Sequence, residues 1–181
     1  MKKLLLLLCF VFIHQVVYPV YFKHLGMSDG LSQVSVMSIY QDCLGRMWFG
    51  TREGVSIYDG ERMRVYKGWE NLDPESSINV LLGHECDHLT GNRQGDIFFR
   101  TCDSLVRYDI REEKFCVVSG CKAKTITSAD GDIWTGYDDM VCRYDEKGDS
   151  LQLYAKTNTP GISSLLISGK KIWIGTYEGL Y

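Results

Sequence analysis

The fold of this chain is decided by one stretch of sequence, Gly45-Arg46-Met47-Trp48-Phe49-Gly50-Thr51-Arg52-Glu53-Gly54-Val55-Ser56-Ile57-Tyr58-Asp59. The same pattern returns three times farther along the chain, at Gly95–Asp109, Gly131–Asp145 and Lys171–Tyr181. One aromatic residue holds the same place in each copy, and these residues stand 50, 36 and 39 positions apart: Trp48, Phe98, Trp134 and Trp173. A period near 40 residues with an aromatic, glycine and Tyr-Asp signature is typical of repeated β-units, most often propeller blades.

The predicted fold is all-β, an incomplete β-propeller of about three and a half four-stranded antiparallel blades. Blades are expected at about 34–66, 85–118, 122–155 and 162–181, and the last copy stops inside its third strand. In a propeller each sheet is covered by its neighbours, so the repeated aromatic side chains are expected to fill the space between sheets. Gly50 is expected to keep its strand thin where another backbone or ring approaches.

Length and composition describe one globular domain. Of 181 residues, 45% are hydrophobic and 24% are charged, and 18 glycines against 3 prolines suit a turn-rich β-protein. The net charge is -3 and no run of Lys or Arg occurs beyond the N-terminus, so no nucleic-acid partner is expected. A stack of blades with two open ends instead predicts association with the remaining propeller blades or with a second copy of the chain.

The N-terminus predicts export. Lys2 and Lys3 precede an unbroken apolar run, Leu4–Ile13, which is too short for a comfortable transmembrane helix but fits a secretory signal. We therefore expect a signal peptide at 1–20, a propeller segment at 21–181 and a periplasmic location. An uncleaved anchor is the alternative, and the cleavage position stays open because no Ala-x-Ala-like site is visible.

A family resemblance is carried by two segments, Asp29-Gly30-Leu31-Ser32-Gln33 and Asp42-Cys43-Leu44-Gly45-Arg46-Met47-Trp48-Phe49-Gly50-Thr51. They resemble the opening of the periplasmic sensor region in hybrid two-component systems of polysaccharide-degrading bacteria, which carries two-component regulator propeller repeats. The second copy departs from the family pattern at Phe98 and Arg100, which replace Trp and Gly. The third copy departs at Tyr137, which replaces Thr.

The resemblance implies a sensor rather than an enzyme. In that family the exported part has two propellers and a β-sandwich, followed by a transmembrane helix, a histidine kinase, a receiver and a DNA-binding domain. This chain would be a fragment of the ligand-sensing propeller, its ligand an oligosaccharide or sugar, and its output the control of carbohydrate utilisation. The family's N-terminal strand, matched by Tyr21–Leu25, would complete the last blade. A free-standing propeller that binds or scaffolds other molecules is the alternative.

The predicted ligand face is the one formed by loops that join strands two to three and four to one. It collects residues from all four copies and from the long loop 67–83: Arg52, Glu53, Trp69, Asp103, Tyr137, Asp138, Asp139, Tyr177 and Glu178. Aromatic rings stack on sugar rings, and carboxylates accept hydrogen bonds from sugar hydroxyl groups. The competing interpretation is an ordinary solvated surface, because turns are polar in most proteins.

A rival hypothesis comes from His84-Glu85-Cys86-Asp87-His88, which has the spacing of a zinc hydrolase motif and also resembles the metal-binding motif of peptide deformylases. On a helix, His84 and His88 would bind zinc and Glu85 would act as general base. The repeat instead predicts a strand at 85–90, and the second deformylase motif is missing. A strand would place His84, Cys86 and His88 on one face, so a strand-borne metal site is a further alternative. The favoured prediction has no catalytic residue, metal or cofactor.

Six cysteines follow the predicted signal: Cys43, Cys86, Cys102, Cys116, Cys121 and Cys142. An even number in an oxidising compartment permits a disulfide framework, and six cysteines allow 15 pairings. Small apolar residues scattered through the blades are the favoured interpretation, and the spacing lacks the Cys-x-x-Cys pairs of zinc ribbons.

Overall fold

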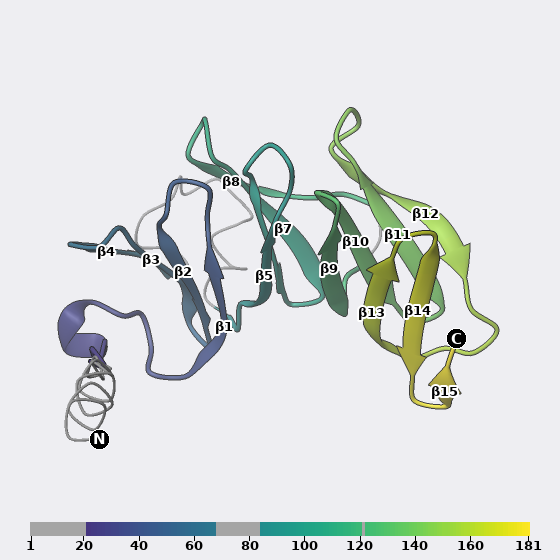
Figure 1. Ribbon diagram of the computed structural model, residues 1–181, viewed down its shortest axis with the longest axis horizontal. Helices are drawn as coiled ribbons and strands as arrows, with labels where there is room; N and C mark the ends of the chain where they lie inside the picture. The colour runs from purple at the N-terminus through teal and green to yellow at the C-terminus, as the bar shows by residue number, and fades with distance from the viewer. Residues whose placement is uncertain (1–20, 68–83, 121) are drawn as a thin grey trace, which may run out of the picture.

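Four antiparallel sheets follow one another along the chain in the computed structural model (Figure 1). The structure describes residues 21–67, 84–120 and 122–181. A short 3-10 helix, η1 (Met27–Asp29), precedes the sheets. The first two sheets contain β1 (Val36–Gln41), β2 (Met47–Thr51), β3 (Gly54–Tyr58) and β4 (Met63–Tyr66), then β5 (Asp87–Gly91), β6 (Ile97–Thr101), β7 (Ser104–Asp109) and β8 (Lys114–Val117).

The third and fourth sheets repeat this order. They contain β9 (Thr125–Ala129), β10 (Asp132–Tyr137), β11 (Met140–Asp145) and β12 (Ser150–Lys156), then β13 (Ile162–Ser168), β14 (Lys171–Thr176) and β15 (Gly179–Leu180). Within each sheet the strands pair antiparallel in chain order. One copy of the repeat forms each sheet, so the all-β fold of successive, unclosed blades predicted from the sequence is confirmed.

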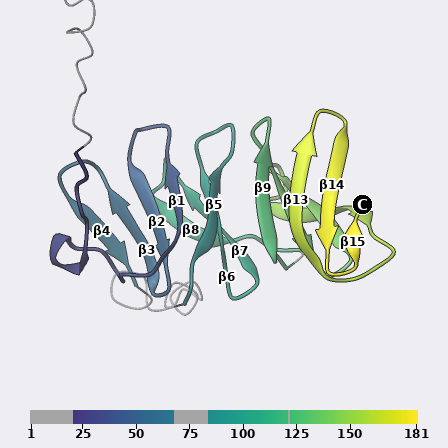
Figure 2. The same ribbon diagram turned by 60° about the horizontal axis from the view of Figure 1, so that its bottom comes forward.

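The first strands of the four sheets, β1, β5, β9 and β13, lie side by side (Figure 2). Backbone hydrogen bonds join each sheet to the next. The amide of Cys86 donates to the carbonyl of Thr51 at 2.8 Å, and the amide of Ile162 donates to the carbonyl of Asp138 at 2.9 Å. The segment that enters each new blade is therefore bonded to the turn between the second and third strands of the preceding blade.

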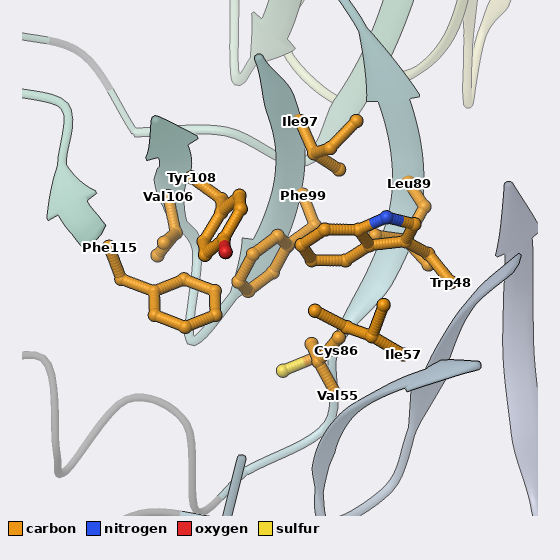
Figure 3. Packing of buried hydrophobic residues seen from close by; sticks show 10 residues of the cluster. All are labelled: Trp48, Val55, Ile57, Cys86, Leu89, Ile97, Phe99, Val106, Tyr108 and Phe115. Atoms are coloured by element: carbon orange, nitrogen blue, oxygen red, sulfur yellow. The ribbon is translucent and has the colours of Figure 1, made fainter. Parts of the chain in front are cut away.

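The repeated aromatic residues pack between the sheets, as their recurrence predicts. Trp48 and Phe98 are 0% exposed and Trp134 is 7% exposed, whereas Trp173 on the last sheet is 42% exposed. The first interface is one apolar cluster drawn from two sheets (Figure 3): Trp48, Val55, Ile57, Cys86, Leu89, Ile97, Phe99, Val106, Tyr108 and Phe115. Burial of such large apolar side chains is the main term that holds neighbouring blades together.

Glycine two positions after the aromatic residue permits this close approach. A Cβ atom on Gly50 would overlap the backbone carbonyl oxygen of Cys86, and one on Gly136 would overlap the Ile162 side chain. In the second sheet Arg100 stands at this place, and its guanidinium pairs with the carboxylate of Asp87 on β5. The departure of the second copy from the repeat is thus compensated by a partly buried ion pair.

The start of the chain differs in detail from the repeat pattern. β1 begins at Val36, two residues after the expected start of the blade at about 34. Tyr21–Leu25, which the resemblance assigns to a last blade that is missing from this chain, forms no strand in the described residues. The next residues cover the first sheet instead. The amide of Ser32 donates to Ser56 Oγ at 2.9 Å, and Ser32 Oγ lies 2.9 Å from Thr51 Oγ1.

The expected signal peptide, most of the long loop after the first blade and Cys121 lie outside the described residues. Among the helices of the described ranges, none is long and apolar enough to cross a membrane. The five cysteines in these ranges form no disulfide with one another. Cys86 and Cys142 are buried as small apolar residues, as expected, but Cys43 and Cys102 are exposed.

Candidate functional site

The turns predicted to bind ligand lie at one edge of the stack. They join β2 to β3, β6 to β7, β10 to β11 and β14 to β15, and the connection from β12 to β13 runs along the same edge (Figure 2). An antiparallel meander of four strands requires this common edge. The chain reverses at alternate ends of the sheet, so the turn from the second to the third strand and the exit from the fourth strand lie at the same end. The repeat thus brings residues 52–53, 103, 137–139 and 177–178 to a common edge.

Arg52 and Glu53 occupy the turn of the first blade. Thr51 Oγ1 accepts from the amide of Glu53 at 3.1 Å and donates to the carbonyl of Gly54 at 3.0 Å, which fixes the turn. The Arg52 guanidinium lies 3.9 Å from the Glu85 carboxylate, and the Glu53 carboxylate lies 3.6 Å from Lys67 Nζ. Because these groups are exposed, each pairing is weak and both side chains remain available to a ligand.

The second and third blades present acidic turns in the left-handed region. Asp103 has φ 60° and Asp138 has φ 54°, a conformation that aspartate tolerates better than most residues. Asp103 Oδ1 lies 3.6 Å from the Arg100 guanidinium. Lys122 Nζ lies 5.4 Å from the centre of the Tyr137 ring, within range of a cation–π contact.

The fourth blade offers the most accessible aromatic side chain of the edge. Tyr177 is 79% exposed, and its ring lies against Gly161, where a Cβ atom would overlap it. The amide of Glu178 donates to Thr176 Oγ1 at 3.2 Å, which repeats the turn of the first blade. Trp69, the other aromatic candidate, lies outside the described residues.

The candidate side chains form a row rather than a pocket. The charged groups of this edge pair with their own sheet or with the adjoining connection, as Asp139 does with Lys156 at 3.4 Å. Within the described ranges, no hydrogen bond or ion pair joins candidates from different blades. An arrangement of this kind would suit an extended ligand better than a small one.

The zinc hydrolase hypothesis is wrong, because residues 84–88 form no helix. His84, Glu85 and Cys86 precede β5, which begins at Asp87, so the expected strand at 85–90 starts two residues late. His88 has φ 54° at a register shift of β5, which breaks the alternation that would have placed His84, Cys86 and His88 on one face. The described residues contain no group of three His, Cys, Asp or Glu arranged to hold a metal.

The chemistry of this segment is that of a packed ion pair. Burial alone would raise the pKa of the Asp87 carboxyl, but the adjacent His88, whose Nδ1 lies 2.9 Å from Asp87 Oδ1, and the hydrogen-bonded Arg100 outweigh burial and lower that pKa. Burial raises the pKa of the Cys86 thiol to about 12. A neutral thiol at this position is the opposite of what a thiolate metal ligand requires.

A groove of about 400 Å³ lies at the opposite edge of the stack, among residues of the second and third blades. Its walls include Arg93, Asp132, Arg143, Lys147 and Tyr154. The sequence interpretation did not identify it. The Arg143-Tyr144-Asp145 segment of the third copy supplies three of its lining residues, but the sequence alone gives no sign that they border a groove.

Comparisons with known proteins find similarity to a histidine kinase and to extracellular domains of hybrid two-component systems. No protein-family model matches it. Histidine kinase P4 of Formosa agariphila is 41% identical over 59 residues, which are 33% of this chain and 4% of that protein. The crystal structure of the extracellular domain of a hybrid two-component system from B. thetaiotaomicron has a TM-score of 0.73 and 25% identity, over 90% of this chain and 25% of that one.

The WD40 β-propeller domain of Doa1 shares the fold alone, with a TM-score of 0.53 and 16% identity over 81% of this chain and 47% of that one. The resemblance to the sensor region of hybrid two-component systems was inferred from the first blade. The similarity to the B. thetaiotaomicron domain and to the Formosa agariphila kinase confirms it. The chain spans about a quarter of the extracellular domain that it matches.

Proposed function

We propose that this chain is part of the extracytoplasmic ligand-sensing propeller of a hybrid two-component sensor that regulates carbohydrate utilisation. The observation that carries the proposal is the likeness to an extracellular domain of such a system over 90% of the chain. The identity to a histidine kinase over 59 residues supports it independently. The chain itself has no catalytic role, it resides in the periplasm, and the kinase activity belongs to other parts of the sensor.

The proposed ligand is an oligosaccharide that lies along the edge formed by the second-to-third-strand turns. The exposed ring of Tyr177 offers a stacking surface, and the acidic groups Asp138 and Glu178 accept hydrogen bonds from hydroxyl groups. Their arrangement as a row favours a ligand of several sugar units over a monosaccharide. Each separate contact is weak, so affinity would come from their sum.

The proposed partners of the chain are further propeller blades. Trp173 occupies the repeat position that is buried in the other three blades, yet 42% of its surface is exposed. Leu166 and Leu180, on the strands beside it, are 59% and 69% exposed. An apolar sheet face of this kind is stabilised when another blade covers it.

The experiment is isothermal titration of the complete extracytoplasmic region of the sensor with a panel of oligosaccharides. We expect one saccharide class to bind, and Tyr177→Ala and Glu178→Gln each to weaken binding at least about tenfold, or 1.4 kcal/mol. Glu146→Gln, at the opposite edge, is the matched control and should leave affinity unchanged. Failure of every saccharide to bind, or unchanged affinity in both edge variants, overturns the proposal.

A further inference from the structure

A chain of three buried hydroxyl groups runs beneath the turn of the first blade. It consists of Ser56 on β3, Ser32 from the segment that precedes β1, and Thr51 at the end of β2, and each residue is at most 1% exposed. Ser56 Oγ donates to Ser32 Oγ at 2.8 Å, and Ser32 Oγ lies 2.9 Å from Thr51 Oγ1. The backbone amide of Ser32 donates to Ser56 Oγ at 2.9 Å. The segment before β1 is thus tied to the two strands that flank the turn.

The hydrogen-bonding capacity of a hydroxyl group fixes the direction of this chain, because each hydroxyl has one proton to donate. Thr51 Oγ1 donates its proton to the carbonyl of Gly54 at 3.0 Å and accepts from the amide of Glu53 at 3.1 Å. The bond between Ser32 and Thr51 is therefore donated by Ser32. The donors follow one another from Ser56 through Ser32 and Thr51 to the carbonyl of Gly54, and hydrogen bonds linked in this way strengthen one another.

The first copy of the repeat alone has serine or threonine at both strand positions of this chain. The pair Thr51 and Ser56 is replaced by Thr101 and Val106, Tyr137 and Cys142, and Thr176 and Tyr181 in the later copies. The turn of the fourth blade keeps the last link, in which Thr176 Oγ1 donates to the carbonyl of Gly179 at 3.1 Å, and that bond is exposed. The buried serines therefore serve a need that is particular to the first blade.

Backbone hydrogen bonds hold the same turn from both sides. The amide of Arg52 donates to the carbonyl of Ser35 at 3.3 Å, and the amide of Gly54 donates to the carbonyl of His84 at 3.1 Å. The first bond comes from the segment that enters the first blade, and the second from the segment that enters the next. The side chains of Arg52 and Glu53 are 63% and 57% exposed, so two accessible groups extend from a fixed backbone.

We propose that Ser32 is a positioning residue of the ligand edge, the row of turns between the second and third strands. By donating to Thr51 Oγ1 it holds the first turn in the conformation in which Arg52 and Glu53 meet a saccharide. The inference rests on the proposed function and makes the first turn a preorganised part of that edge. Weak contacts with a saccharide contribute most when the protein groups are ordered before binding, because ordering them during binding costs free energy.

The test is isothermal titration of the complete extracytoplasmic region with the saccharide class that binds to it. Ser32→Ala removes the donor to Thr51 and should weaken binding about threefold to tenfold. Thr51→Val removes the acceptor, keeps the shape of the side chain and should weaken binding similarly. The double variant should lose no more than either single variant, since both interrupt one chain of hydrogen bonds. Ser28→Ala, at an exposed serine of the same segment, is the matched control.

Two further variants separate positioning from stability. Ser56 is as buried as Ser32, but its hydroxyl donates to Ser32 rather than to Thr51. Ser56→Ala should therefore lower Tm about as much as Ser32→Ala and leave the affinity nearly unchanged. In a protein that already carries Arg52→Ala and Glu53→Ala, Ser32→Ala should not weaken binding further, since the side chains that it positions are gone.

A second measurement needs no saccharide. Exchange of the Glu53 amide hydrogen, followed by NMR, should be about tenfold faster in Ser32→Ala than in the wild type, because Thr51 Oγ1 holds that amide. Ser28→Ala should leave this exchange rate unchanged.

Two outcomes would overturn the positioning role and leave the proposed function intact. One is unchanged affinity in Ser32→Ala where Tyr177→Ala weakens binding. The other is an equal loss of affinity in Ser32→Ala and Ser56→Ala, because the effect would then be one of stability. Failure of every saccharide to bind would instead refute the proposed function, and an unchanged exchange rate of the Glu53 amide would refute the positioning role separately.

Discussion

Trp48 Nε1 donates a 2.8 Å hydrogen bond to Oδ2 of Asp42, which lies at the other side of the first turn of the repeat. The same carboxylate accepts from Arg46 Nε at 2.7 Å, and its other oxygen accepts from the amides of Leu44 and Arg46 at 3.0 and 2.9 Å. One buried side chain therefore shapes the turn and orients the aromatic ring that fills the interface with the second blade.

Replacing this carboxylate should destabilise the first blade. Asp42→Ala leaves the Arg46 guanidinium and the Trp48 indole without their buried acceptor, so we expect a loss of about 3 kcal/mol in the free energy of unfolding. Urea denaturation followed by tryptophan fluorescence measures it. Asp59→Asn is the control, since Asp59 makes similar turn bonds at an exposed position and should cost much less. Equal losses in the two variants would contradict this role of Asp42.

The stability of the protein should depend on Asp42 through its ionisation. Burial would raise the pKa of this carboxyl, but hydrogen bonds from Trp48 and Arg46 outweigh burial, so the folded pKa lies below the ordinary 3.8. The stability that the ionised Asp42 carboxylate contributes is then fully present above pH 3.8, and it is lost as the pH falls through the folded pKa. We expect the Tm difference between the wild type and Asp42→Asn to shrink below about pH 4. A difference that is constant from pH 3 to 6 would refute the assignment.

The close approach of the first two sheets at Gly50 predicts a second stability effect. Gly50→Ala places a Cβ atom against the Cys86 carbonyl, so the sheets must separate, and we expect a loss of about 1–3 kcal/mol. Gly148→Ala, in an exposed turn with only moderately close neighbours, is the matched control. Chemical denaturation of both variants provides the comparison, and a neutral Gly50→Ala would show that the interface adapts.

Replacing the repeated aromatic residue should lower the free energy of unfolding most in the blades where that residue is most buried. Trp48→Ala removes a fully buried ring and should cost about 3–5 kcal/mol, whereas Trp48→Phe, which mimics the second copy, should cost far less. Trp173→Ala should cost less than about 1 kcal/mol in this chain. Denaturation curves of the three variants decide the point. A large loss for Trp173→Ala would mean that this face is already covered in solution.

Thiol labelling should separate the cysteines by exposure. A maleimide reagent should react with Cys43 and Cys102 in the folded protein and spare Cys86, whose thiol is buried and has a pKa near 12. Mass spectrometry after proteolysis identifies the labelled positions, and labelling in urea provides the control for intrinsic reactivity. Rapid labelling of Cys86 without denaturant would be inconsistent with the first interface.

Local sequence patterns predicted the strands of the repeated blades. They misled at two segments whose structure depends on residues far away in the chain. The repeat predicted a blade at about 122–155, and β9 to β12 form it between Thr125 and Lys156. Tyr21–Leu25 has equally good strand residues and forms none, since a strand requires a neighbour to satisfy its backbone. His84–His88 misled for a related reason, because its Asp87 pairs with Arg100 on the next strand, which lies outside the motif.

The sequence by itself determined the repeat, the number of sheets and the order of strands in each, because hydrophobic periodicity and turn residues act within a few positions of the chain. It also determined which edge carries Arg52 and Tyr177, since an antiparallel meander leaves no other arrangement. Only the tertiary structure decided how the blades are joined. The contacts of Arg107 with Asp149 and of Phe98 with Tyr144 link residues more than 40 positions apart, and such pairings depend on how twisted sheets pack.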